Sequence, residues 1–339
     1  MSTSNKITDS TSTTDMQEEI LTDDDKRYIL FPLKYPDMYD MYKNHVAQFW
    51  TVEELDMAQD RAAYEKLDKN TQNFIAYVLS FFSMADGLVI ENINDNFADE
   101  VKPLEARMFY CMQNLIESIH AETYAQLLQT IIVDPKERHK LIHSVHTFEC
   151  IRAKHKWVEK YMNRDMTFAR RILAFVILEG VFFSAAFCAI YYLKKKGVEM
   201  HGLITSNEFI SRDEGLHTNF GVLLYKKYLP KTRLSQEDVV DMFKEAVEIE
   251  HKCCIEALPV RLIGMNAELM HQYVQFVADR LLVSLGYEKI YNVNNPFNWM
   301  VNISCQTKSS FFEVRVTDYA LAGVGVKKED NVFSLDVDF

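Results

Sequence analysis

The stretch of sequence that decides the fold is ILAFVILEGVFFSAAFCAIYYL, residues 172–193. It is apolar almost throughout, carries one charged residue, Glu179, and is flanked by basic residues at 170–171 and 194–196. Its length and flanks would suit a membrane span. A central acidic residue, however, costs about 2.5–3.5 kcal/mol on insertion scales, and no other segment looks comparable. We therefore expect no membrane association and interpret the stretch as the central helix of a large soluble bundle, surrounded by other helices.

The composition supports a helical protein. The chain has 339 residues, with 49 acidic and 37 basic side chains and a net charge of -12. A nucleic-acid surface needs a basic patch, so we expect no nucleic-acid partner. With only 10 glycines and 7 prolines there are few turn formers, which disfavours a β sandwich or barrel. The six cysteines include no C-x-x-C pair and several lie in apolar stretches, which is typical of buried thiols in the reducing cytoplasm.

Helical periodicity divides the chain into three parts. Residues 1–21, rich in Ser, Thr and Asp, are expected to form a disordered leader. Residues 22–318 should form one all-α domain, and residues 319–339 a flexible tail. Thr51 and Glu54 predict a capping box at the start of the first helix. The predicted helices are 53–67, 70–93, 105–133, 136–161, 168–195, 206–228, 235–258 and 266–285.

Two acidic residues stand where a core should be apolar. Asp86 lies within YVLSFFSMADGLVI (77–90), and Glu179 lies within the stretch quoted above. An ionised carboxylate cannot be buried alone, so each must be paired, protonated or bound to a metal.

A second pattern, Glu-x-x-His, puts a carboxylate and an imidazole on one face of a helix. It occurs at Glu117/His120, Glu214/His217, Glu248/His251 and Glu268/His271, and by itself it is a weak signal. Order along the chain separates the four pairs, because Asp86 precedes the first and Glu179 precedes the second. The pairs at 248 and 268 follow no such acid, and we interpret both as structural residues. Glu248/His251, among Glu245, Glu250 and Lys252, is typical of a solvated face.

The first two units predict a metal centre. Its ligands would be Asp86, Glu117, His120, Glu179, Glu214 and His217, with a buried salt-bridge network as the alternative. Four carboxylates and two imidazoles suit two iron or manganese ions better than a structural zinc ion. An acid from each of two helices and Glu-x-x-His from each of two others is the ligand arrangement of ferritin-like di-iron bundles. We therefore predict a ferritin-like bundle with additional helices.

A small residue follows each acidic ligand, at Gly87, Ser118, Gly180 and Gly215. Glycine inside a helix costs about 1 kcal/mol relative to alanine, so these positions call for a reason. Our hypothesis is that the small residues let the four helices approach closely around the metals.

These motifs resemble the small subunit of class I ribonucleotide reductase, in its eukaryotic and viral branch. The resemblance is carried by SMADG (83–87), ESIHAETY (117–124), LEGVFFS (178–184) and ISRDEGLH (210–217). It implies a di-iron-oxo centre activated by O2, with manganese as an alternative metal, and the six ligands match one by one.

The resemblance also implies roles for residues around the centre. Tyr124, one helical turn after His120, matches the residue oxidised to a stable tyrosyl radical, although on sequence alone it could be an ordinary core tyrosine. Phe183, Phe187 and Ile210 match the apolar side chains around that radical. Trp50 and Asp213 match the electron-relay tryptophan and the acid that links its indole to His120. Tyr319 matches a tail tyrosine that carries the oxidising equivalent onward.

The resemblance further implies two partners, a second copy of the chain in a homodimer and the large catalytic subunit. The tail ends in NVFSLDVDF (331–339), and Phe333, Leu335 and Phe339 are the expected anchors in a groove of the large subunit. The reaction would be the reduction of ribonucleotides to deoxyribonucleotides in that partner. An iron-storage protein or a di-metal oxidase would share the ligands, and a purely structural bundle would leave Asp86 and Glu179 unpaired.

Overall fold

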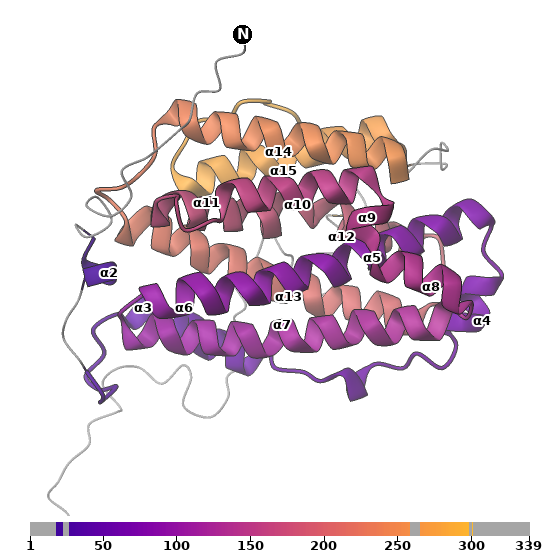
Figure 1. Ribbon diagram of the computed structural model, residues 1–339, viewed down its shortest axis with the longest axis horizontal. Helices are drawn as coiled ribbons and strands as arrows, with labels where there is room; N and C mark the ends of the chain where they lie inside the picture. The colour runs from indigo at the N-terminus through magenta and orange to yellow at the C-terminus, as the bar shows by residue number, and fades with distance from the viewer. Residues whose placement is uncertain (1–17, 23–26, 258–264, 298–299, 301–339) are drawn as a thin grey trace, which may run out of the picture.

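The computed structural model describes residues 18–22, 27–257, 265–297 and 300. Within these ranges the regular structure is entirely helical, which confirms the predicted all-α fold. Figure 1 shows long helices lying side by side along the longest axis of the molecule.

The first half of the chain contributes α2 (Glu19–Thr22), α3 (Pro36–Ala47), the 3-10 turn η2 (Val52–Glu54), α4 (Asp60–Glu65), α5 (Lys69–Asn92), the π segment η3 (Ile93–Phe97), α6 (Ala98–Glu100), α7 (Leu104–Ile131), α8 (Pro135–Ile142), α9 (Ser144–Thr147) and α10 (Glu149–Tyr161). The second half contributes α11 (Phe168–Ile177), the π segment η4 (Leu178–Phe182), α12 (Ser184–Lys195), α13 (His201–Leu223), the π segment η5 (Leu224–Tyr228), α14 (Gln236–Ala257) and α15 (Ala267–Leu285).

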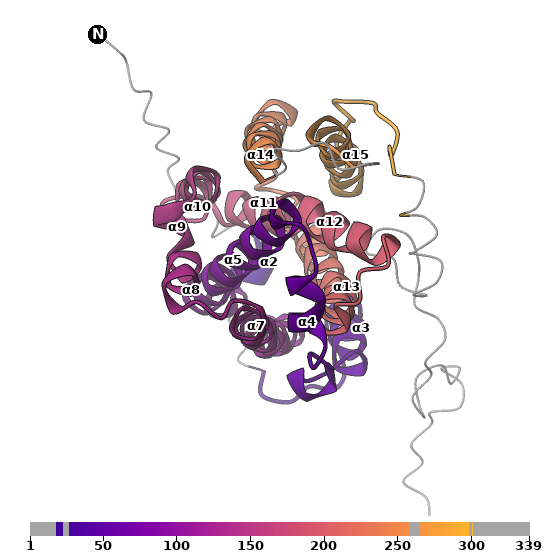
Figure 2. The ribbon, with the colours of Figure 1, turned by 90° about the vertical axis from the view of Figure 1, so that its right-hand side faces the viewer.

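Four long helical units enclose the centre of the molecule. They are α5, α7, the continuous α11–η4–α12 unit and α13, seen nearly end-on in Figure 2. Helix α3 packs against α7 and α13, and the α14–α15 pair covers the η4 side of the bundle. The unit α11–η4–α12 contains the stretch 172–193 and is therefore central, as its hydrophobicity predicted.

Burial explains the apolar helices. Two helical stretches in the described chain, Lys69–Glu100 and Phe168–Lys195, are long and apolar enough to cross a membrane by length and composition. The expectation that no other segment is as long and apolar as residues 172–193 is therefore wrong. The most apolar window of Phe168–Lys195 is 100% buried inside the bundle, so its hydrophobicity is that of a core helix.

A local change of helical pitch occurs at Glu179, the acidic residue of the stretch 172–193. Residues 178–182, including Glu179, form a π turn inside the otherwise α-helical unit. Such single π turns insert an extra residue per turn and occur frequently at functional sites. Hydrophobic periodicity cannot reveal this turn, because every neighbouring residue is apolar and buried.

The predicted helix 136–161 is three helices. The chain leaves helical geometry at His143 and again at Phe148. Side chains satisfy the carbonyl groups freed at these breaks: Thr147 donates to the Lys140 and His143 oxygens, each at 3.0 Å, and Arg152 to those of Val145 and His146. These bonds join residues four to seven positions apart and accompany the two helix ends, and apolar periodicity does not reveal them.

The region before α5 also differs from the prediction. The Thr51 N–H donates to Glu54 Oε1 at 3.0 Å, as a capping box requires, but the helix it starts is only the turn η2. The chain then extends, and α4 is short. Asp60 accepts hydrogen bonds from the Gly202 and Leu203 amides, at 2.9 and 2.8 Å, and so joins α4 to the start of α13. Helix α13 begins before the predicted residue 206, and α3 was not predicted.

The predicted leader boundary at residue 21 is too late. Glu18 is 1% exposed and Ile20 is buried. The Glu18 carboxylate accepts hydrogen bonds from the Lys231 and Thr232 amides, both at 2.7 Å. This acid therefore fixes α2 to the connection between η5 and α14.

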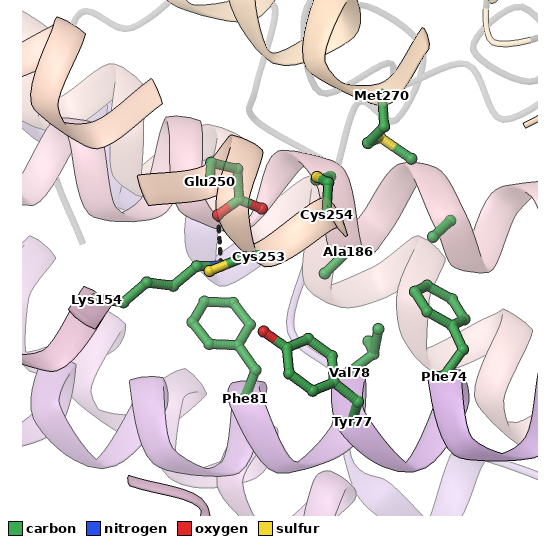
Figure 3. Close-up of a pocket in the computed structure, with 12 residues that line it drawn as sticks. Phe74, Tyr77, Val78, Phe81, Lys154, Ala186, Glu250, Cys253, Cys254 and Met270 are labelled. Atoms are coloured by element: carbon green, nitrogen blue, oxygen red, sulfur yellow. Dashed lines mark ion pairs between the residues drawn. The ribbon is translucent and has the colours of Figure 1, made fainter. Parts of the chain in front are cut away.

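A buried ion pair joins α10 to α14 (Figure 3). Lys154 Nζ lies 2.5 Å from Glu250 Oε2, with 3% and 4% of the two side chains exposed. The ammonium also lies over the Phe81 ring, 3.7 Å from its centroid. Burial raises the pKa of the Glu250 carboxyl, and Lys154 opposes that effect. The pair thus brings two charges together in surroundings that would exclude either one alone.

Lys154→Met should lower the free energy of unfolding by about 3–5 kcal/mol, because Glu250 would lose its cation in the core. The matched control is Lys160→Met, which breaks the exposed Lys160–Glu245 pair between the same helices and should cost at most about 1 kcal/mol. Urea unfolding of both variants measures the difference. Equal losses would contradict the account.

Candidate metal centre

The six predicted ligands converge inside the four-helix core. Asp86 comes from α5, Glu117 and His120 from α7, Glu179 from η4, and Glu214 and His217 from α13. All six residues are 0% exposed. The helical spacing predicted from sequence is therefore met, since each Glu-x-x-His pair presents both side chains to the interior.

Two carboxylates lie between the two imidazoles. His120 Nδ1 is 3.3 Å from Glu117 Oε2 and 3.1 Å from Glu214 Oε1. His217 Nδ1 is 3.0 Å from the other Glu117 oxygen and 3.3 Å from the other Glu214 oxygen. Each glutamate thus offers one oxygen to each histidine, which is the geometry of carboxylates that bridge two ions.

The remaining two acids are Glu179 and Asp86. Glu179 Oε1 is 3.7 Å from His217 Nδ1, and the polar atoms of Glu117, Glu179, Glu214 and His217 lie within 4.8 Å of one another. Asp86 is fully buried on α5, and the charges of Glu117, His120 and Glu214 act on its pKa.

The cluster fits a pair of cations. Polar atoms buried without a hydrogen-bond partner include both Asp86 oxygens, Glu117 Oε2, His120 Nδ1, Glu179 Oε2 and Glu214 Oε1. Unpartnered buried oxygens cost free energy, and several of them facing one point are what a metal site provides. A salt-bridge network would pair His120 Nδ1 with Glu117 Oε2 and Glu214 Oε1, at 3.3 and 3.1 Å, but would leave both Asp86 oxygens and Glu179 Oε2 unsatisfied. Oxygen-rich sites with two imidazoles suit iron or manganese.

Burial and mutual charge set the protonation of the ligands. Burial raises the pKa of Asp86 and of Glu179 well above the usual range, and the neighbouring carboxylates add to this effect. Burial alone would lower the pKa of His217, but Glu117 and Glu214 outweigh it and raise the value to about 9. The pKa of His120 is likewise raised, by Asp213, Glu117 and Glu214.

A hydrogen-bonded connection leads from the cluster to an indole. The Trp50 Nε1–H donates to Asp213 Oδ2 at 2.7 Å, and the same oxygen lies 3.3 Å from His120 Nε2. The Trp50 ring also stacks on His120, with centroids 6.0 Å apart. Arg212 contacts the other Asp213 oxygen at 3.2 Å and holds the carboxylate in place. The predicted association of Trp50, Asp213 and His120 is present.

Sequence analysis missed two polar residues that touch the ligands. Gln113, fully buried on α7, donates through Nε2 to Glu179 Oε1 at 3.1 Å. His45, on α3, lies with its Nε2 3.2 Å from His217 Nε2. The signal for Gln113 was its position four residues before Glu117 on the same helical face. His45 comes from an unpredicted helix and had no comparable signal.

Tyr124 lies in an apolar wall beside the cluster. It is 2% exposed and its hydroxyl has no hydrogen-bond partner. Phe82 stacks on its ring, with centroids 4.8 Å apart and planes at 5°. Phe183 and Phe187 pack on Phe82, at 5.4 and 4.9 Å. Phe82 was missed, although it lies one turn before Asp86.

The structure does not test the roles of five other predicted site residues. Ile210 is buried on α13, one turn before Glu214, and its contact with Tyr124 stays a prediction. Tyr319, Phe333, Leu335 and Phe339 lie outside the described residues.

The hypothesis about small residues concerned the four ligand-bearing helices, and Gly180 is tightly packed against a different helix. A Cβ added to Gly180 would lie 2.5 Å from Leu281 Cδ1 of α15 and 3.4 Å from Thr218 Cγ2 of α13. A side chain at this position would therefore require Leu281 to shift, whereas the contact of that side chain with α13 would be an ordinary one. Nothing lies within 4 Å of the corresponding atom at Gly87, so close packing does not explain that glycine.

Fold and site together define a helical-bundle protein of the di-metal carboxylate class. Comparison with known proteins gives the family. The family model described as "Ribonucleotide reductase, small chain" matches residues 27–296. The chain belongs to the ribonucleotide reductase small chain family, which confirms the resemblance found in the sequence.

The relatives cover nearly the whole chain. The ribonucleoside-diphosphate reductase small chain of Trypanosoma brucei brucei is 48% identical over 326 residues, 96% of each chain. The vaccinia virus (strain Ankara) small chain is 46% identical over 322 residues, 95% of this chain and 100% of the viral one. The solved ribonucleotide reductase homodimer structure from Saccharomyces cerevisiae matches with a TM-score of 0.77 and 30% identity, over 86% of this chain and 94% of the yeast chain.

Metal affinity should rise with pH. Asp86, Glu179, His120 and His217 have raised pKa values, so they hold protons that a cation must displace. Between pH 6 and 9, each displaced proton should strengthen Mn²⁺ binding by about tenfold per pH unit. Anaerobic calorimetric titration in buffers of different ionisation enthalpy measures both the Mn²⁺ affinity and the number of protons released on binding. An affinity independent of pH would contradict this protonation scheme.

Proposed function

We propose that this chain is the radical-generating small subunit of a ribonucleoside-diphosphate reductase and that Tyr124 carries the radical. The observation that carries the proposal is the buried Tyr124 hydroxyl, which has no hydrogen-bond partner and comes from α7 one helical turn after the predicted ligand His120. The family membership supports it independently.

The six clustered residues would hold two iron ions, with manganese as an alternative that the same donors accept. With O2, the bound metal pair would supply the oxidising equivalent that removes one electron and one proton from Tyr124.

The protein's own contribution is to control the Tyr124 proton and to exclude water. Burial raises the pKa of the Tyr124 phenol well above its usual value, and the charges of Asp86, Glu214 and Glu117 raise it further. The phenol therefore holds its proton until the electron leaves. Phe82, backed by Phe183 and Phe187, covers the ring on one side and keeps reductants away from the oxidised residue.

The contacts of Asp213 support a transfer route for the oxidising equivalent. Asp213 accepts from Trp50 and lies within 3.3 Å of His120, so it connects the indole to the proposed ligand sphere. Burial opposes ionisation of Asp213, but His120 and Arg212 hold its pKa below the usual range. An ionised Asp213 can accept a hydrogen bond from the indole N–H of Trp50 and so orient the ring. An iron-storage protein would not require this hydrogen-bonded connection between the ligands and an indole.

The transfer would continue through Tyr319 to the large subunit, where the ribonucleoside diphosphate is reduced. Phe333, Leu335 and Phe339 would anchor the tail in that partner. We further propose a homodimer, by analogy with the yeast structure, and a cytoplasmic location. The five cysteines in the described part of the chain carry free thiols, which supports a reducing compartment.

Two variants test the assignment from different sides. The apo protein is loaded with ferrous iron and O2, and ribonucleoside-diphosphate reduction is measured with the cognate large subunit. Tyr124→Phe and a chain lacking residues 333–339 should both be inactive, but for different reasons. The first should still compete with wild type for the large subunit, and the second should not. Turnover by Tyr124→Phe would contradict the radical assignment, and turnover by the truncated chain would contradict the tail assignment.

A further inference from the structure

The two Glu-x-x-His motifs outside the metal centre are brought together by the fold. Glu248/His251 lies on α14 and Glu268/His271 on α15. The His251 and His271 rings stack with centroids 3.8 Å apart and planes at 25°. Both pairs were predicted to be structural, with Glu248/His251 on a solvated face, but His251 and His271, twenty positions apart, contact each other across two helices.

The surroundings leave one imidazole nitrogen without a partner. The Gln275 side-chain amide lies 3.0 Å from His271 Nε2 and occupies that side of the ring. His271 Nδ1 is buried and has no hydrogen-bond partner. Both histidines are only partly exposed, so the pair is enclosed between the helices rather than displayed in solvent.

Glu248 supplies a carboxylate beside the pair. Glu248 precedes His251 by three residues on α14 and so lies on the same face of that helix. Burial and the neighbouring His251 lower the pKa of His271, and the charge of Glu248 acts in the opposite direction. Glu248 is exposed, and its ion pair with Lys252, at 3.5 Å, is also exposed. Such a pair contributes little, so the carboxylate can turn toward a ligand at small cost.

We propose that His251, His271 and Glu248 bind one divalent transition-metal ion of the Zn²⁺ type between α14 and α15. Two imidazoles with a carboxylate are donors that select zinc, copper or nickel over magnesium or calcium. Binding requires the two rings to leave the stack, because the nitrogen lone pairs lie in nearly parallel ring planes and do not converge on one point in this arrangement. Gln275 can support the bound form, because its amide can turn to accept the N–H of the His271 nitrogen that stays off the metal.

An ion at this position would tie together the two helices that cover η4. Leu281 of α15 lies against Gly180, directly after Glu179. Bound metal would stabilise the α14–α15 pair, and with it the packing over that segment, in proportion to the ion concentration. The proposed site is separate from the six-residue cluster and shares no ligand with it.

Equilibrium dialysis of the full chain against Zn²⁺, followed by metal analysis, tests the proposal. The central cluster is the same in every protein compared, so the difference in bound zinc reports the proposed site. The His251→Ala/His271→Ala variant should bind one ion fewer per chain than wild type. Glu248→Gln, a milder change, should lower the affinity for that ion by more than about tenfold.

The matched control is His139→Ala/His143→Ala, which removes another contacting histidine pair, exposed at the end of α8 with ring centroids 4.3 Å apart. It should keep all the bound zinc, and Zn²⁺ should raise its Tm as it does for wild type, whereas the rise should be smaller without His251 and His271. Equal zinc content in wild type and the His251/His271 variant would overturn the proposal. So would a loss confined to the control.

Discussion

The burial of four carboxylates and two imidazoles at one point is the constraint on which the rest of the structure depends. An ionised carboxylate in an apolar core is prohibitively costly unless cations or hydrogen-bond donors face it. The long apolar helices provide that water-free interior, and the π turn at residues 178–182 carries Glu179 within it. The close approach at Gly180 lets α15 pack against the same segment. The packed helices therefore serve to hold ionisable side chains in an interior from which water is excluded.

The cluster has two unlike ends, and the difference fits the proposed chemistry. Glu179 and His217 lie beside Gln113 and His45, which supply polar contacts but no redox-active ring. His120 stacks on Trp50 and lies one helical turn before Tyr124 on α7. His120 is the point where these features meet, because its Nδ1 faces the bridging carboxylates while its Nε2 faces Asp213. One imidazole thus connects the proposed metal, the indole and the acid that orients both rings.

Much of this arrangement could be predicted from the sequence because buried acids are exceptions to hydrophobic patterning. Asp86 and Glu179 were found for that reason, and the long helices α5, α7 and α15 followed from their periodicity. Breaks accompanied by side-chain bonds to the backbone could not be predicted from apolar periodicity: Asp60 bonds to the distant start of α13, and Thr147 and Arg152 bond to nearby carbonyl groups around α9. Phe82 was missed because a core phenylalanine is ordinary until its partner ring is known. The contact between His251 and His271 depends on how α14 and α15 pair, which no local pattern contains.

The measurement that tests the central claim most directly is low-temperature electron paramagnetic resonance after ferrous iron and O2 are added to the apo protein, with the Tyr124→Phe variant alongside. The account predicts a tyrosyl doublet in the wild-type protein and its absence in the variant, with both proteins binding the same amount of iron. Iron binding without any radical in the wild type would contradict the role given to Tyr124. A doublet that persists in the variant would place the radical on another tyrosine, and failure to bind iron would contradict the assignment of the six buried ligands.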